Sequence, residues 1–326
     1  MTTKLSILDQ SPVMAGLGAR RAIEETLALA KRADELGYHR YWLAEHHAIA
    51  ALADPCPEIL LARLGAETKR IRVGTGGVLL PYYSAFRTAE TFRMLEALYP
   101  GRIDLGIGRA PGGDMRTAQA VGGGRFPDAS EFPNQVAHLK DLLEGTARPV
   151  RLQPEVDTAP EIWLLGSSDY SGALAAQLGL SFAFAHFINP RGGDAVTRLY
   201  KEKFTQNFPG GKPHAIVCTF AIVAETDEEA ERLAAPIDLR RLHMALNIDS
   251  AVPTYEEAAR HRYSAEERQY VLSQRARAVI GGVRKAVPEM KHLVEKYDAD
   301  ELMVLTITGD YESRRRSYEL LIEAFQ

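Results

Sequence analysis

The chain has 326 residues, of which 46% are hydrophobic, 25% charged and 8% aromatic. This composition is typical of a globular protein and excludes a fibrous or low-complexity one. The 39 lysines and arginines against 43 aspartates and glutamates give a formal net charge of −4, which argues against a dedicated nucleic-acid binder. The densest basic run, 314–316, lies among helically spaced apolar residues, so we interpret it as a solvated helix face.

The sequence also predicts where the protein resides and which sites it lacks. It has no run of about 18 apolar residues and no signal-peptide segment at the N-terminus, so we expect a cytoplasmic protein with no membrane partner. Its two cysteines, Cys56 and Cys218, exclude a disulfide framework and a four-sulfur metal site. We expect both thiols to be reduced and at least one to be buried. Because an HExxH motif is absent, we expect no metal site.

Eight short apolar runs predict strands. They are nearly continuous in apolarity, which is typical of parallel strands buried on both faces. In chain order they span 5–8, 41–44, 71–80, 103–107, 162–165, 182–187, 215–223 and 302–307. Helical patterns lie between them, including 19–36, which Gly37 is placed to end, and 84–98, which opens with Ser84. Thr226 and Ser264 are each followed by glutamate three residues later, a capping-box signature of a helix start.

The repeated strand–helix order predicts a TIM (β/α)8 barrel, with a doubly wound sheet as the alternative. No linker or shift in composition divides the chain, so we expect a single domain spanning 1–326. The length beyond the usual 250 or so residues falls in two insertions, at 109–134 and about 236–278. We expect both insertions to sit where barrel loops carry function.

Barrel active sites lie where the strands end, so residues just after each apolar run are the candidates. The second run is followed by Glu45-His46-His47. Adjacent strand residues point to opposite sides, so at most one imidazole faces the barrel mouth, and a packed histidine pair without chemistry is the alternative. The third run contains Gly76-Gly77. Glycines inside a core strand indicate a bulge, a close flat ligand or a bend against a helix.

The fourth and fifth runs end in groups suited to binding phosphate. Arg109 follows the fourth run, and its fork-shaped guanidinium suits bidentate contact with phosphate or carboxylate. The glycines around it do not form a dinucleotide fingerprint, because Pro111 replaces the third glycine. Ser168 and Ser171 lie where the fifth run passes into a predicted helix, which indicates a phosphate cup or plain helix capping. Because successive strands carry the two groups, together they can grip one phosphate.

Taken together, several motifs resemble the bacterial luciferase-like flavin monooxygenases, most closely their single-chain, non-luminescent branch. The motifs are 5–12 (LSILDQSP), 38–47 (YHRYWLAEHH), the glycine-containing strand and 101–111 (GRIDLGIGRAP). Segments 300–304 (DELMV) and 317–321 (SYELL) also match, so the resemblance covers nearly the whole chain. It implies a luciferase-like TIM barrel that binds FMN or reduced FMN, and a homodimer. A sister branch uses the deazaflavin F420.

The resemblance also assigns cofactor-binding residues. Arg109, Ser168 and Ser171 match phosphate-contacting positions of the family. Gly76 and Gly77 match a β-bulge, often with a non-prolyl cis peptide, behind the isoalloxazine ring.

By the same resemblance, His46 is the implied catalytic residue, acting as an acid/base group or a hydrogen-bond donor. The implied reaction starts from reduced FMN supplied by a separate flavin reductase. Reduced FMN reacts with O2 to form a flavin peroxide, which transfers one oxygen atom to a small organic substrate. The protein binds the flavin, shields it from water and positions the substrate.

Other functions remain open at this point. They are a non-enzymatic flavin-binding or storage protein, an F420-dependent hydride-transfer oxidoreductase, and an unrelated phosphate-binding barrel enzyme. Gly108 replaces a cysteine of luciferase, which argues against luminescence, and the loop 48–57 is atypical of the branch. The sequence names no substrate. Tyr82, Tyr83 and Phe86 suggest a hydrophobic pocket, or else they pack against a helix.

Overall fold

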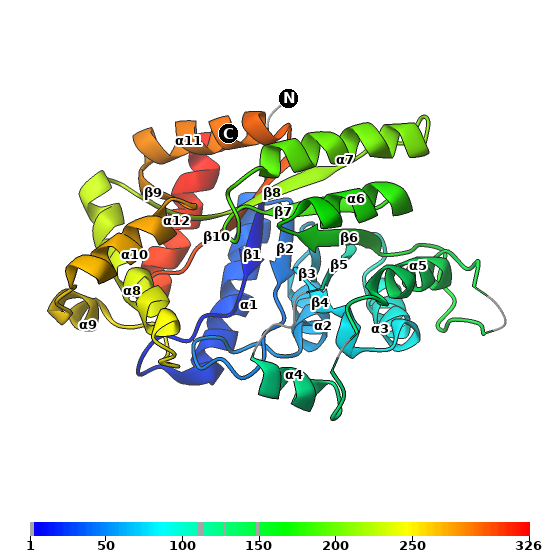
Figure 1. The fold of residues 1–326 in the computed structure, drawn as a ribbon, viewed down its shortest axis with the longest axis horizontal. Helices are drawn as coiled ribbons and strands as arrows, with labels where there is room; N and C mark the ends of the chain where they lie inside the picture. Colours follow the sequence, from blue (N-terminus) through cyan, green and yellow to red (C-terminus); the bar gives the residue numbers. More distant parts are fainter. Residues whose placement is uncertain (1–2, 110–113, 127, 148–149) are drawn as a thin grey trace.

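The strands form a closed parallel barrel. The computed structural model describes residues 3–109, 114–126, 128–147 and 150–326. Its strands are β1 (Lys4–Asp9), β2 (Arg40–Leu43), β3 (Arg72–Thr75), β4 (Val78–Leu79), β5 (Ile103–Gly108), β6 (Glu161–Gly166), β7 (Ser181–Ala185), β8 (Ala215–Ala224), β9 (Ala278–Gly282) and β10 (Glu301–Leu305). Each pairs in parallel with its neighbour, and β10 pairs with both β8 and β1, which closes the ring (Figure 1). The predicted TIM (β/α)8 barrel is confirmed.

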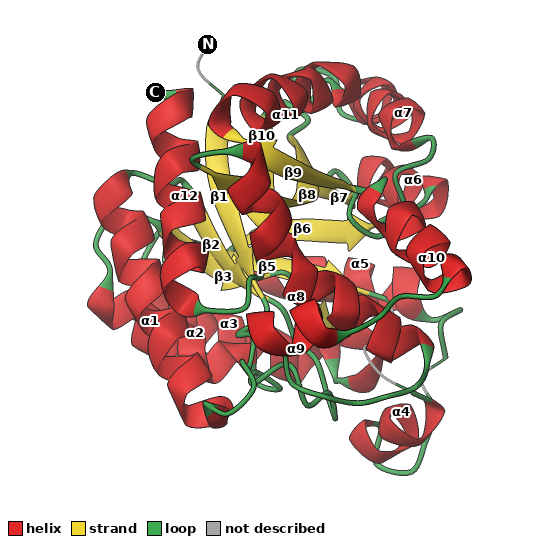
Figure 2. Ribbon diagram, turned by 90° about the vertical axis from the view of Figure 1, so that its left-hand side faces the viewer, coloured by secondary structure: helices red, strands yellow, loops and turns green. Residues whose placement is uncertain are grey.

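Helices surround the barrel on its outside (Figure 2). They are α1 (Gly18–Leu36), α2 (Pro57–Glu67), the short 3-10 helix η1 (Leu80–Tyr82), α3 (Ala85–Leu98), α4 (Met115–Val121), α5 (Phe132–Leu143), α6 (Asp169–Leu178), α7 (Gly193–Asn207), α8 (Asp227–Ala245), α9 (Tyr255–Arg260), α10 (Ala265–Arg275), α11 (Val283–Tyr297) and α12 (Tyr311–Phe325). Their ends follow the sequence signals: Gly37 ends α1 in the left-handed conformation, and Ser84 caps α3. None of the helices in the described ranges combines the length and the apolar character that crossing a membrane requires.

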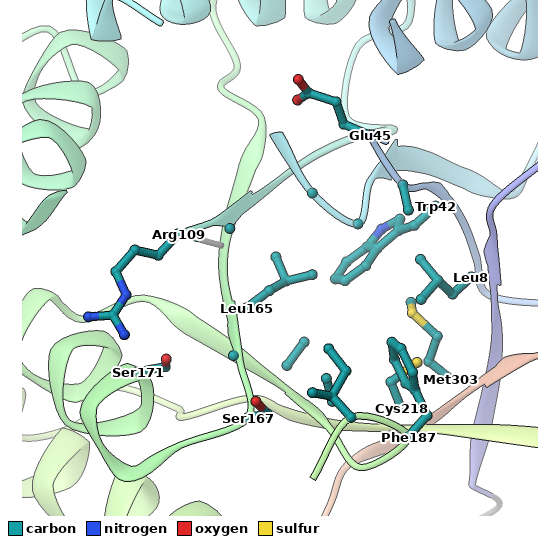
Figure 3. Close-up of a pocket in the computed structure, with 18 of the residues that line it drawn as sticks. Leu8, Trp42, Glu45, Arg109, Leu165, Ser167, Ser171, Phe187, Cys218 and Met303 are labelled. Atoms are coloured by element: carbon teal, nitrogen blue, oxygen red, sulfur yellow. The ribbon is translucent and has the colours of Figure 1, made fainter. Parts of the chain in front are cut away.

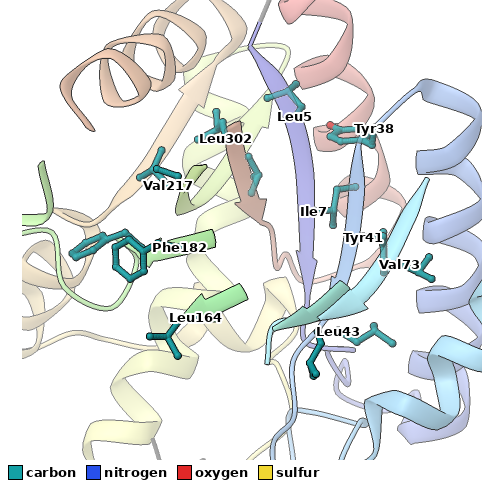
Figure 4. Close-up of a cluster of buried hydrophobic side chains, with 14 of the residues drawn as sticks. Leu5, Ile7, Tyr38, Tyr41, Leu43, Val73, Leu164, Phe182, Val217 and Leu302 are labelled. Atoms are coloured by element: carbon teal, nitrogen blue, oxygen red, sulfur yellow. The ribbon is translucent and has the colours of Figure 1, made fainter. Parts of the chain in front are cut away.

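Side chains alternate between the two faces of each strand and build two apolar layers. Outward-facing residues such as Ile7, Tyr41 and Val217 pack between the strands and the helices (Figure 4). Inward-facing residues such as Leu8 and Trp42 fill the barrel itself. This alternation fixes which residue of each strand reaches the interior, and so decides what lines the pocket described below.

Charged side chains close the end of the barrel at which the strands begin. The Arg40 guanidinium lies 2.8 Å from an Asp104 carboxylate oxygen and 3.1 Å from one of Glu301. All three residues are buried. Burial opposes ionisation of Glu301, but His214, Arg40 and Ser6 outweigh it and hold its pKa at about 2. The opposite end, where the strands finish, is therefore the open one.

Three sequence predictions need correction. The third run is not one strand but two, β3 and β4, separated at Gly76-Gly77. β9 lies at the end of the second predicted insertion and pairs with the second half of β8, a strand that the sequence prediction did not include. Arg314 is not on a solvated face, because it is buried at 1% exposure and ion-paired to Asp9 at 2.6 Å.

The second predicted insertion is largely helical, and the first contains one short helix. Helix α4 lies within 109–134, of which residues 110–113 and 127 are outside the described residues. Helices α8, α9 and α10 occupy most of the second insertion, between β8 and β9. The chain after α8 reaches the loop that follows β1, because Val252 donates its N–H to the Val13 carbonyl at 2.8 Å. The second insertion therefore flanks the open end of the barrel, as expected.

Candidate active site

A pocket of about 280 Å³ opens where the barrel strands end. Its lining includes all six residues predicted from the sequence, namely His46, Gly76, Gly77, Arg109, Ser168 and Ser171. Arg109 and Ser171 lie together at one end, while apolar side chains including Trp42, Leu8 and Met303 gather at the other (Figure 3). The pocket thus has a polar end and an apolar end, and the roles of the six residues stay predictions.

The polar end is built from the ends of β5 and β6, which are neighbours in the sheet. Helix α6 starts here, and the free N–H groups of its first turn favour an anion. Ser168 is the residue before this helix, yet its hydroxyl makes no capping hydrogen bond within the described part of the chain. The Arg109 guanidinium lies over the Tyr170 ring, 4.4 Å from its centroid. The arrangement leaves hydroxyl and guanidinium donors available to one anionic group.

Gly76 and Gly77 interrupt the third strand beside the pocket. Gly74 pairs with Asp104 and Val78 pairs with Ile107, so four steps along this strand span only three along β5. One extra residue on one strand defines a β-bulge, so the bulge interpretation of the glycines is confirmed. The Gly76–Gly77 peptide bond is cis. Any Cβ at position 77 would lie 2.6 Å from the Gly106 carbonyl oxygen, so β5 itself requires glycine there.

The two histidines after β2 separate in space. His46 lines the pocket, and its Nδ1 is shielded from solvent with no hydrogen-bond partner among the described residues. Burial lowers the pKa of His46, and this effect outweighs the opposing influence of the Ala44 backbone. His47 turns away to the Glu45 carboxylate, 2.7 Å from its Nε2. Of the two histidines, His46 alone is among the described residues that line the pocket, as the alternation of strand residues predicts.

Glu45 anchors the loops around this histidine. It is 4% exposed and accepts hydrogen bonds from the Leu79 N–H at 2.8 Å and the Tyr83 hydroxyl at 2.5 Å. Tyr82, Tyr83 and Phe86 are not among the described residues that line the pocket, so the aromatic pocket suggested for them is wrong. Phe86 instead packs against the outer core, which is the alternative interpretation.

Sequence reasoning missed most of the apolar lining. Side chains of several strands and of the loop after β7 supply it, among them Leu8, Trp42, Leu165, Cys218, Met303 and Phe187. Burial raises the pKa of the Cys218 thiol, which suits an inert wall and not a nucleophile. Ser167, next to the predicted Ser168, also lines the pocket. Strand alternation, counted back from His46, was the signal that could have found Trp42 and Ala44.

The sequence matches known proteins over nearly its full length. The family model for luciferase-like monooxygenases matches residues 3–290. The chain is 44% identical to the uncharacterized protein YwcH of Bacillus subtilis, covering 98% of each chain. It is 36% identical to the luciferase-like monooxygenase of Escherichia coli K12, covering 99% of this chain and 97% of the other. It is 34% identical to the N-acetyl-S-alkylcysteine monooxygenase of Bacillus subtilis, covering 98% of each.

Solved structures show the same fold. Apo-MsnO8 superposes with a TM-score of 0.90 at 35% identity, over 99% of this chain and 98% of the other. The oxygenating constituent of 3,6-diketocamphane monooxygenase from Pseudomonas putida, solved with FMN, gives a TM-score of 0.75 at 20% identity, over 99% and 97%. An F420-dependent secondary alcohol dehydrogenase gives 0.67 at 15%, over all of both chains. A more distant relative in sequence, 24% identical over 93% of this chain and 89% of its own, is the oxygenase component of the trigonelline monooxygenase of Acinetobacter baylyi.

Proposed function

The chain belongs to the luciferase-like monooxygenase family, and from that premise we propose that it uses reduced FMN and O2 to insert one oxygen atom into a small, mainly apolar organic substrate. One observation carries this proposal. A single pocket brings together a polar end with hydroxyl and guanidinium donors, an apolar interior and a half-buried histidine whose Nδ1 has no hydrogen-bond partner among the described residues. The polar end suits a flavin phosphate, the apolar interior suits a flat ring system, and the histidine suits a reacting substrate.

The pocket residues fit FMN. Arg109, Ser168 and Ser171, with the first turn of α6, supply the donors that a phosphate dianion requires. The bulge at Gly76 and Gly77 presents backbone without side chains along the pocket, which suits close contact with a flat ring. When bound, reduced FMN supplies the two electrons and the site of oxygen activation. The pocket residues hold and orient it.

The chain's own residues then control water and protons. Leu8, Trp42 and Met303 exclude water from the inner end of the pocket, which strengthens every polar interaction made there. His46 is held neutral by burial, so its Nδ1 can accept a proton or, in the other tautomer, donate one to a reacting oxygen. His46 is thus the proposed catalytic residue.

The proposal extends to partners and setting. We propose that a separate flavin reductase supplies the reduced FMN, which agrees with the relative that is named as an oxygenase component.

We propose a homodimer formed through α2 and α3, since Ile59 is 67% exposed, Met94 52% and Leu98 54% on these helices. Residues 1–326 form one domain in this proposal. Free thiols at Cys56 and Cys218 agree with a cytoplasmic setting.

Anaerobic titration of the purified protein with FMN, reduced FMN and F420 tests the cofactor. Reduced FMN is expected to bind most tightly, and oxygenated buffer with ¹⁸O2 is expected to place one labelled atom in an oxidised organic substrate. Tight binding of FMN with no oxidation of any substrate in a broad panel would indicate a flavin-storage protein. Preference for F420 would replace oxygen insertion with hydride transfer. No affinity for either cofactor would overturn the proposal.

A further inference from the structure

A cationic side chain from the second insertion covers the inner wall of the barrel near its open end. The Arg241 guanidinium of α8 lies over the Phe220 ring of β8, 4.4 Å from its centroid. Phe220 comes two residues after Cys218, so both side chains face the same side of β8. Cys218 lines the candidate active site, and Phe220 belongs to the same inward-facing cluster, one step closer to the end of the strand. Arg241 therefore lies next to the inward-facing layer of β8, one step beyond the pocket residue Cys218 towards the open end of the barrel.

Arg241 has no hydrogen-bonded or ion-paired partner within the described ranges. Its side chain makes no hydrogen bond or ion pair with any described residue, and its Nη1 is shielded from solvent. Burial lowers its pKa to about 10, against the opposing attraction of Asp238. Arg275 donates twice to one oxygen of that carboxylate, at 2.6 and 2.9 Å, and the other oxygen has no hydrogen-bond partner among the described residues. Asp238 thus attracts Arg241 without a hydrogen bond between them, and an anion bound here gains a charge-assisted hydrogen bond that the described residues do not supply.

A second arginine connects this cation to the pocket. Arg277 directly precedes Ala278, which pairs with Phe220 in the sheet, and the charge of Arg277 is near enough to Arg241 to lower the Arg241 pKa. Arg277 donates from Nη1 to the Ile188 carbonyl at 2.9 Å, and Ile188 lines the pocket. Its Nε is shielded from solvent and has no hydrogen-bond partner among the described residues. Two guanidinium groups with unused donors thus lie near this end of the pocket, and Arg277 contacts a pocket residue directly.

We propose that Arg241, supported by Arg277, binds the carboxylate of an anionic organic substrate whose apolar part enters the pocket. This inference rests on the proposed monooxygenase function and adds its substrate class. A planar carboxylate matches the two parallel N–H groups of a guanidinium. The flavin phosphate is assigned to Arg109 at the other end, so Arg241 is free for the substrate. The carboxylate then fixes which carbon or heteroatom of the substrate faces the flavin.

Binding measurements on the FMN-loaded protein test this without turnover. Isothermal titration would compare octanoate with octanamide, and phenylacetate with phenylacetamide, pairs that differ in charge and hardly in shape. The wild-type protein is expected to bind each carboxylate about tenfold more tightly than its amide, the usual gain from a charge-assisted hydrogen bond. Arg241→Met is expected to remove this preference, and Arg241→Lys to keep part of it. Inorganic phosphate is expected to compete weakly.

Arg232→Met is the matched control. Arg232 lies on the same helix and covers an aromatic ring, that of Tyr255 at 4.7 Å, but it is 56% exposed and far less desolvated. This variant loses the same charge and should keep the carboxylate preference. Equal binding of acids and amides by the wild type, no binding of either acid, or a preference that survives Arg241→Met would each overturn the proposal. FMN affinity, measured first on every variant, separates such a result from failure of the flavin function.

Discussion

We assign the flavin phosphate to the polar end of the pocket, and comparing the affinities of two ligands tests this assignment. FMN and riboflavin differ only in the phosphate, so the ratio of their dissociation constants measures what the protein gains from that group. Arg109→Met removes the guanidinium but keeps an apolar chain that can lie over the Tyr170 ring. The variant should therefore lose FMN affinity and leave riboflavin affinity nearly unchanged. Fluorescence quenching of each flavin on binding provides the assay.

The expected loss of FMN affinity depends on how exposed each substituted side chain is. A hydrogen bond to a charged group is worth about 1.5–3 kcal/mol. Arg109 is exposed, so solvent screening argues for the lower limit, about 1.4 kcal/mol or tenfold in Kd. Ser171 is half-buried, and Ser171→Ala should cost about 1 kcal/mol, or about fivefold, again for FMN alone. Added salt should weaken FMN binding to the wild type and have less effect on Arg109→Met.

A charge-matched control excludes a general electrostatic effect. Arg116 lies on α4, in the same connection after β5, and is also exposed. Arg116→Met should leave the ratio of FMN to riboflavin affinity at its wild-type value. Equal losses for the two flavins in Arg109→Met, or no loss for either, would refute the placement of the phosphate at this end of the pocket.

Three further predictions concern catalysis, stability and assembly. His46→Ala should abolish substrate oxidation at unchanged FMN affinity. Because burial lowers the pKa of His46, wild-type activity that needs the neutral imidazole should persist to a lower pH than the ordinary histidine pKa of 6.5 allows, as a pH profile of kcat would show. Glu301→Gln should lower the free energy of unfolding in urea by about 3 kcal/mol, since it leaves a buried guanidinium short of a partner, whereas exposed Glu295→Gln should be neutral. The depressed pKa of Glu301 stabilises the fold above about pH 4.5, and this contribution should disappear as the pH falls towards 2. Ile59→Glu combined with Met94→Glu should convert a dimer into a monomer in light scattering, and an unchanged mass would contradict the interface assigned to α2 and α3.

The fold was predictable because its signals are local and repeated. Each barrel strand is a short apolar run, and helix ends carry their own residues, such as Gly37 after α1 and Ser264, whose capping box with Glu267 is formed. Arg314 is a residue for which reasoning from sequence neighbours gave the wrong environment. Its neighbours predict a solvated face, but its partner, Asp9, is 305 positions away in the sequence. Periodicity cannot reveal a buried ion pair that only the closed barrel creates.

The candidate site was predictable to the extent that it follows strand ends. His46, Arg109 and Ser168 each come just after a strand, where barrel topology gathers residues from the whole chain. Arg241 was not predictable in this way, because it lies on a helix of an insertion and reaches the barrel through the ring of Phe220. Its position depends on how α8 packs against β8, which no short motif encodes.

Two glycines beside the pocket allow the link between backbone packing and site geometry to be tested directly. A Cβ at position 77 would meet backbone of β5, 2.6 Å from the Gly106 oxygen, whereas one at position 108 would lie 3.8 Å from the nearest atom, a methyl group of Leu79. Both glycines line the pocket, so they differ in packing and not in location. Gly77→Ala should therefore lower the free energy of unfolding by about 2 kcal/mol, the usual cost of overpacking, while Gly108→Ala stays near wild type. Urea unfolding followed by tryptophan fluorescence measures both. If the two variants were equally stable, the approach of β5 would not be what demands glycine at 77, and a requirement of the bound ligand would have to explain it.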